Sequence, residues 1–107
     1  EYVFSVPGAL KNAIEWTVSS GEFMNKPTAL ITASGLGEKA HESLLLILKT
    51  LEANIGENAA LLISHARTKL NTEGIVSDAA TVEALKLLIE SFTQTINEYG
   101  KMEDLPE

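Results

Sequence analysis

The stretch Glu1-Tyr2-Val3-Phe4-Ser5-Val6-Pro7-Gly8-Ala9-Leu10-Lys11-Asn12-Ala13-Ile14-Glu15-Trp16 predicts a loop that leads into a helix. The Ser5 hydroxyl can accept hydrogen bonds from amides that have no partner in the first helical turn. Pro7 is tolerated in that turn because it has no N–H to satisfy. Apolar residues then recur at helical spacing and predict one apolar face: Val6, Leu10, Ala13, Ile14 and Val18.

Two short segments further along the chain predict strands. Residues 28–33 (TALITA) and 58–63 (NAALLI) are mostly apolar, and the first is partly β-branched. Such segments suit strands that are buried on both faces of a parallel sheet. A tight loop, Ser34-Gly35-Leu36-Gly37, follows the first strand, and a polar loop over residues 64–77 follows the second.

Residues 38–54 predict a second helix. They place apolar side chains at helical spacing, and Gly56 stands where such a helix commonly ends. The apolar run over residues 44–48 is too wide for a single buried stripe. We therefore expect this helix to meet a second surface, such as another subunit.

The last helix is predicted from the most regular pattern in the chain. It begins at Ser77 or Asp78 and ends at Gly100, after which residues 101–107 form an acidic tail. Its apolar residues alternate steps of three and four: Val82, Leu85, Ile89, Phe92, Ile96 and Tyr99. This spacing predicts one stripe that faces the core.

The order of the predicted elements is loop, helix, strand, helix, strand, helix. Helical crossovers between strands make parallel sheets, so the sequence predicts an α/β fold with a parallel sheet. Two strands are few for such a sheet, and one side of the strand over residues 28–33 has no partner in the sequence.

Composition excludes several classes of function. The 107 residues carry 15 acidic and 8 basic side chains, a net charge of −7, so the chain has no field that attracts nucleic acid or an anionic membrane. The absence of cysteine excludes disulfides, thiolate catalysis and cysteine-ligated metal. No apolar run reaches the ~20 residues of a membrane span and no signal peptide is visible, which predicts a cytoplasmic protein.

The first sixteen residues also resemble a known family. In the NAD(P)H-dependent FMN reductases, a flavodoxin-like group, a Pro-Glu-Tyr-Asn loop is followed by Ser-x-Pro-Gly-x-Leu-Lys-Asn-Ala-Ile-Asp-Trp. Val3 stands where the family usually has Asn, and Glu15 where it often has Asp. The matching residues are Glu1-Tyr2, Ser5, Pro7-Gly8, Leu10-Lys11-Asn12-Ala13-Ile14 and Trp16.

This resemblance implies a flavodoxin-like fold, a three-layer arrangement with a parallel sheet in the middle. The chain would supply its C-terminal part, in the order loop-α-β-α-β-α over residues 1–100, followed by the tail over residues 101–107. The first three strands and two helices of the family fold are then missing from the sequence. We expect the chain to form a homo-oligomer, to exchange elements with another copy, or to follow a segment that the sequence does not contain.

The resemblance also implies a site. Ligands of open α/β sheets bind beyond the carboxyl ends of the strands, which is where the loop of residues 34–37 would lie. By resemblance to the family, Glu1, Tyr2, Val3 and Phe4 would flank the isoalloxazine ring of FMN, and Ser34, Gly35, Leu36 and Gly37 would approach its pyrimidine end. On spacing alone, the two glycines favour a plain strand-to-helix turn. The family holds the FMN phosphate in an earlier loop that this sequence lacks.

Other candidate residues have simpler interpretations. His65 follows the second strand near Arg67 and could contact a nicotinamide phosphate, although a solvated loop histidine is the commoner case. His41 is interpreted as a packing or interface residue. The sequence contains no metal-ligand spacing, no Gly-x-Ser-x-Gly motif and no P-loop motif, and we predict neither a metal site nor a catalytic side chain. The aromatic residues within helical patterns are interpreted as core: Trp16, Phe92 and Tyr99.

The function implied by the resemblance is that of a flavin-dependent oxidoreductase. Hydride passes from NADPH or NADH to FMN, and electrons then reach a small-molecule acceptor such as a flavin, a quinone, an azo compound or a metal oxyanion. The cofactor performs this chemistry, which agrees with a chain that shows no catalytic dyad. Two alternatives are a non-catalytic half-domain that serves assembly and a flavodoxin-like electron carrier that binds FMN without reacting with NADPH.

Overall fold

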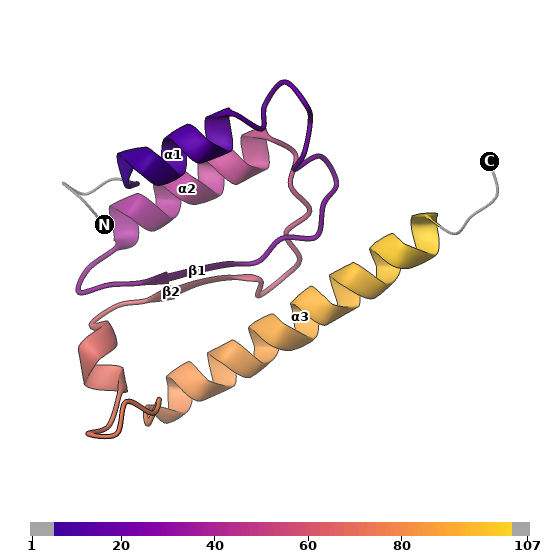
Figure 1. Ribbon diagram of the computed structural model, residues 1–107. Helices are drawn as coiled ribbons and strands as arrows, with labels where there is room; N and C mark the ends of the chain where they lie inside the picture. The colour runs from indigo at the N-terminus through magenta and orange to yellow at the C-terminus, as the bar shows by residue number, and fades with distance from the viewer. Residues whose placement is uncertain (1–5, 104–107) are drawn as a thin grey trace.

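The computed structural model describes residues 6–103, so the predicted loop of residues 1–4 and the Ser5 cap lie outside the described residues. Figure 1 shows a sheet of β1 and β2 with α1 and α2 on one face and α3 on the other. The strands run parallel, so the predicted α/β fold with helices on both faces of a parallel sheet is confirmed. The elements are α1 (Gly8–Glu15), β1 (Leu30–Ala33), α2 (Glu38–Thr50), β2 (Ala60–Ile63), the 3₁₀ helix η1 (Ala66–Lys69) and α3 (Ala79–Glu103).

The two faces of β1 differ in how well they are covered. The hydroxyl of Thr32 is hydrogen-bonded to His41 of α2, so Thr32 and Leu30 face the layer of α1 and α2. Ile31 faces the opposite layer, yet its side chain is 49% exposed because α3 packs along β2. The prediction that this strand is buried on both faces is therefore wrong at Ile31.

The outer edge of β1 has no strand partner within residues 6–103, as the sequence predicted. The segments that precede β1 and β2 are also hydrogen-bonded to each other, but out of register with the strands. The N–H of Thr28 donates to the carbonyl of Asn54 (2.9 Å), and the N–H of Asn54 donates to the carbonyl of Lys26 (3.0 Å). Both strands consequently begin two residues later than predicted, at Leu30 and Ala60. The free edge of β1 leaves backbone groups available for a further strand.

The chain leaves helix α2 through a left-handed residue that is not glycine, two positions after Thr50. Glu52 has a φ of 61°, and its N–H donates to the carbonyl of Lys49 (3.0 Å) while that of Ala53 donates to Leu48 (3.0 Å). This pair of bonds is a Schellman motif, which satisfies the last carbonyls of the helix. The predicted end at Gly56 is wrong because Glu52 takes the left-handed position instead.

Gly56 has a different reason to be glycine. A Cβ at this position would lie 2.8 Å from both the Ser91 Oγ and the Thr95 Oγ1 of α3. The lack of a side chain therefore lets the loop before β2 approach α3 closely.

Helix α3 begins where the sequence predicted and ends later. The Asp78 carboxylate accepts hydrogen bonds from the hydroxyl (2.6 Å) and the N–H (3.0 Å) of Thr81, which makes Asp78 the predicted cap. These two bonds, assisted by the positive charge of Lys69, hold the pKa of Asp78 below its ordinary value. The predicted end at Gly100 is wrong because Gly100 does not take a left-handed conformation and α3 continues to Glu103.

The buried side of α3 is rotated from the predicted stripe. Thr81, Leu88 and Thr95 are buried, at steps of seven residues, whereas Ile89 is 61% and Ile96 46% exposed. Neighbouring residues lie about 100° apart around a helix, so these isoleucines stand beside the sheet-facing line. Helix α3 is thus apolar over more of its circumference than the sheet covers.

The first helix buries only part of its predicted face. Val6 and Ile14 are buried, but Leu10 and Val18 are exposed. Trp16, which was predicted as core, caps the end of α1 and is 79% exposed, so that prediction is wrong. The other predicted core aromatics, Phe92 and Tyr99, are half-buried. None of the helices within residues 6–103 is long and apolar enough to cross a bilayer.

Candidate functional site

Two loops are joined at the carboxyl ends of the strands. The N–H of Ser34 donates to the carbonyl of Ile63 (3.1 Å), and the N–H groups of His65 and Ala66 donate to the carbonyls of Gly35 (3.0 Å) and Ser34 (3.1 Å). These bonds continue the pairing beyond β1 and β2. The loop of residues 34–37 is therefore held at the edge where parallel sheets bind their ligands.

The same bonds leave backbone donors of this loop available. Within residues 6–103 the N–H groups of Gly35 and Leu36 have no hydrogen-bond partner, and both residues are exposed. The Leu36 carbonyl accepts a bond from the Ser64 hydroxyl (3.3 Å), which helps to orient the peptide. A Cβ at Gly35 would meet no atom within 4 Å, so a flat ligand can approach here. Contact of Ser34, Gly35 and Leu36 with the pyrimidine end of a flavin, which the family resemblance implies, stays a prediction.

Gly37 is required by the backbone itself. It precedes α2 with a φ of 85°, and a Cβ there would lie 3.0 Å from the Ser34 Cβ and 3.2 Å from the Leu62 Cδ1. A plain strand-to-helix turn accounts for Gly37, whereas Gly35 has an ordinary φ and open space around it. Contact between Gly37 and a cofactor stays a prediction.

A cavity of about 400 Å³ opens beside this loop. Two of the predicted site residues, Ser34 and Gly35, line it, while Leu36 and Gly37 do not. Its lining includes one arginine, Arg67, which is exposed, and no Asp or Glu lines it. The complete lining is Ala33, Ser34, Gly35, His65, Ala66, Arg67 and Thr68.

Residues 65–68 form the second wall of the cavity, and the sequence predicted only part of it. His65 is exposed, as expected of a solvated loop residue, but it also lines the cavity and has a φ of 52°. Thr68 donates its hydroxyl to the His65 carbonyl (2.7 Å) within η1. A single 3₁₀ turn has no hydrophobic periodicity, so the sequence carried no signal for η1 or for Thr68 as a lining residue.

His41 acts in packing, as predicted. Its Nδ1 lies 2.7 Å from the Thr32 Oγ1, which links α2 to β1. Burial lowers the pKa of His41, and the nearby Glu42 carboxylate opposes this shift. The side chain is therefore biased toward its neutral form.

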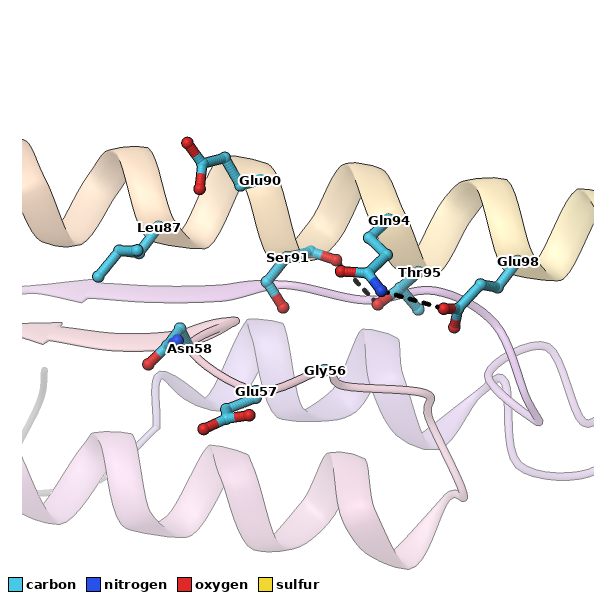
Figure 2. A pocket seen from close by; sticks show the side chains of 9 residues that line it. All are labelled: Gly56, Glu57, Asn58, Leu87, Glu90, Ser91, Gln94, Thr95 and Glu98. Atoms are coloured by element: carbon cyan, nitrogen blue, oxygen red, sulfur yellow. Dashed lines mark hydrogen bonds between the residues drawn. The ribbon is translucent and has the colours of Figure 1, made fainter.

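A second cavity, of about 350 Å³, lies between α3 and the loop before β2, at the amino end of that strand. Figure 2 shows Glu57 on the loop and Glu90 on α3 pointing away from each other. The third carboxylate, of Glu98, accepts a hydrogen bond from Gln94 (3.2 Å). No cationic side chain lines this cavity, and the part of the chain that the structure describes contains no group of three His, Cys, Asp or Glu suited to a metal ion.

Comparisons with known proteins identify the family of the chain. A relative, the NADH-dependent flavin reductase subunit 2 of Lactobacillus johnsonii, is 28% identical over 112 residues. The alignment covers 94% of this chain and 61% of the relative, so the chain spans about three-fifths of that protein's length. The model of the NADPH-dependent FMN reductase family matches residues 1–68, which include β1, the loop of residues 34–37 and the whole lining of the 400 Å³ cavity. The chain therefore belongs to the NADPH-dependent FMN reductase family.

Proposed function

We propose that this chain forms part of the flavin site of an NAD(P)H-dependent flavin reductase. The observation that supports this most directly is the pair of exposed N–H groups of Gly35 and Leu36, which have no partner within residues 6–103. They stand at the carboxyl edge of a parallel sheet, beside a cavity, in the segment that matches the family. The relative named a flavin reductase subunit points to the same activity.

In this proposal the chain binds and orients the cofactor. The chemistry that FMN supplies when bound is the acceptance of hydride from NAD(P)H and the delivery of electrons to a flavin, quinone, azo or similar acceptor. The N–H groups of Gly35 and Leu36 donate to acceptor atoms at the pyrimidine end of the ring and favour negative charge there. Glycine at position 35 allows close contact with the ring, and residues 1–4 cover it from another side.

We also propose that the chain works in a homo-oligomer. The apolar run of residues 44–48 includes Leu46, which is 67% exposed on α2. Exposed apolar surface of this kind commonly marks a contact between subunits. Sedimentation equilibrium at micromolar concentration should show a species larger than one chain, and a monomer would contradict this part of the proposal.

The test of flavin binding is an equilibrium titration with FMN, followed by quenching of flavin fluorescence. Gly35→Ala should weaken FMN binding about tenfold, because the added methyl group enters open space that the ring would occupy. Gly100→Ala is the matched control: the same methyl group enters open space on α3, and FMN affinity should stay the same.

Three outcomes would change the proposal. Equal FMN affinity in both variants would remove Gly35 from the site, and a wild-type chain that does not quench FMN would favour the non-catalytic half-domain. FMN binding without oxidation of NADPH or NADH would favour an electron carrier. Rapid oxidation of either nucleotide by the FMN-loaded protein would support the reductase.

A further inference from the structure

The cavity beside the loop of residues 34–37, here called the carboxyl-edge cavity, has a charge opposite to that of the chain as a whole. The chain has a net charge of −7 and a single arginine, Arg67. That arginine lines the cavity beside Ser34 and Gly35, and no carboxylate lines it. Charged groups act mainly within about 10 Å in physiological salt, so the local sign of a cavity can differ from the net charge.

Arg67 also has no partner in the described part of the chain. The ion pair found there joins Lys11 and Glu15 of α1, and the Arg67 side chain forms neither an ion pair nor a hydrogen bond within residues 6–103. A guanidinium presents five N–H donors in a planar fork. All five are available to a ligand that enters the cavity.

The backbone on the amino side of Arg67 is firmly held. His65 and Ala66 donate their N–H groups to Gly35 and Ser34, at 3.0 and 3.1 Å. On its other side, Thr68 donates both its N–H (2.9 Å) and its hydroxyl (2.7 Å) to the His65 carbonyl. These bonds hold the backbone at Arg67 close to the exposed N–H groups of the neighbouring loop.

We propose that Arg67 binds a phosphate group of a nucleotide ligand in this cavity. Arginine matches phosphate because two parallel N–H donors reach two oxygens of the same group. Gly35 lines the same cavity, so one nucleotide can place its ring against the loop and its phosphate at Arg67. The identity of that nucleotide rests on the proposed function. The family holds the FMN phosphate in an earlier loop that this sequence lacks, so we expect Arg67 to bind a phosphate of NADPH or NADH, and the phosphate of FMN is the other source that the experiments distinguish.

The first experiment tests the phosphate site without a flavin. Binding of inorganic pyrophosphate is measured by titration calorimetry for the wild-type chain, Arg67→Gln and Lys69→Gln. Both variants remove one positive charge from η1, but Lys69 does not line the cavity. We expect Arg67→Gln to weaken pyrophosphate binding at least tenfold and Lys69→Gln less than twofold, since charge-assisted bonds depend on contact geometry. Arg67→Lys should recover only part of the affinity.

The second experiment separates the two sources of phosphate. If Arg67 holds the flavin phosphate, Arg67→Gln weakens FMN at least tenfold and leaves riboflavin unchanged. If it holds the dinucleotide, the dissociation constant of FMN stays the same and the KM for NADPH or NADH rises at least tenfold with little change in kcat. Either result supports the phosphate site.

Two results would overturn it. One is a wild-type chain without measurable pyrophosphate binding. The other is an equal loss of affinity in Arg67→Gln and Lys69→Gln, with circular dichroism showing that both are folded, since this would indicate a diffuse charge effect. Pyrophosphate binding that depends on Arg67 in a chain that never quenches FMN would refute the flavin reductase proposal alone and leave the phosphate site standing.

Discussion

The two ends of the sheet carry cavities of similar size and opposite character. At the carboxyl end, about 400 Å³ is bounded by joined loops, among whose residues are Arg67 and Gly35, and the Gly35 N–H has no partner within residues 6–103. At the amino end, about 350 Å³ lies beside α3 with three glutamates and no cation on its wall. An acidic chain produces the second kind of surface by default, whereas the first kind needs a particular arrangement of donors.

The two cavities also differ in the direction in which their polar groups point. In Figure 2 the carboxylates of Glu57 and Glu90 point apart, so they cannot act on one ligand atom together. At the carboxyl end, the hydrogen bonds between the two loops bring Gly35 and Arg67 to the same cavity. Size alone would rank the two cavities equally, and the positions of their polar groups decide between them.

The largest effect on folding is expected from Gly37→Ala. A side chain in the left-handed region costs roughly 1–2 kcal/mol, and the new Cβ would press on Ser34 and Leu62 for about another 1–3 kcal/mol. Urea unfolding should therefore show a loss of about 2–5 kcal/mol. Gly35→Ala, in open space two residues earlier, should change the free energy of unfolding by less than about 0.5 kcal/mol. Equal losses in the two variants would contradict the distinction between a structural and a ligand-facing glycine.

A smaller effect is expected from Asp78→Ala at the start of α3. The pKa of Asp78 is lowered by its bonds to Thr81, so the ionised carboxylate stabilises the folded chain above its ordinary pKa of 3.8. That contribution is lost as the pH falls through the lower pKa of the folded state. The urea midpoint of Asp78→Ala should lie below that of the wild type at pH 7 and approach it in strong acid. Asp78→Ser, which keeps a capping oxygen, should retain most of the wild-type midpoint, and a difference that does not depend on pH would exclude the carboxylate as its cause.

The smallest effect is expected at the amino-end cavity. Replacing Glu57, Glu90 and Glu98 together with glutamine removes three negative charges far from the loop of residues 34–37. The dissociation constants of FMN and pyrophosphate should change by less than about twofold, since exposed charges are screened over about 10 Å. A tenfold gain in affinity for either ligand would mean that net charge, rather than the local arrangement at Arg67, controls binding.

Much of the fold could be predicted because the sequence patterns that specify it lie within single helices, strands and caps. The alternation of helical and strand segments predicted the parallel sheet, and Asp78 identified the start of α3. The errors arise where tertiary contacts override local preference. Glu52, a residue that seldom adopts a left-handed conformation, ends α2 in place of Gly56, and Gly100 stays helical although glycine is common at helix ends.

The core was the least predictable part of the fold. Periodicity locates the apolar residues of a helix but does not say how many of them the sheet will cover. Ile89 and Trp16 both fit helical patterns and are nevertheless exposed.

The candidate site was predictable at its loop and less so at its second wall. The position of residues 34–37 follows from the rule that ligands bind beyond the carboxyl ends of parallel strands. The sequence placed Arg67 near His65, but its position across the cavity from Gly35 depends on hydrogen bonds between segments thirty residues apart. Such pairing carries no signature in a single sequence.

The left-handed backbone of His65 bears on how selection acts at this edge. A φ of 52° raises the free energy of a folded chain by about 1 kcal/mol relative to glycine, which adopts it freely. Selection for stability alone would favour glycine at this position. Backbone strain of this kind is often retained where a side chain serves function. Glu52 has the same conformation at the end of α2, so at both positions the path of the backbone through a turn costs the folded chain some stability.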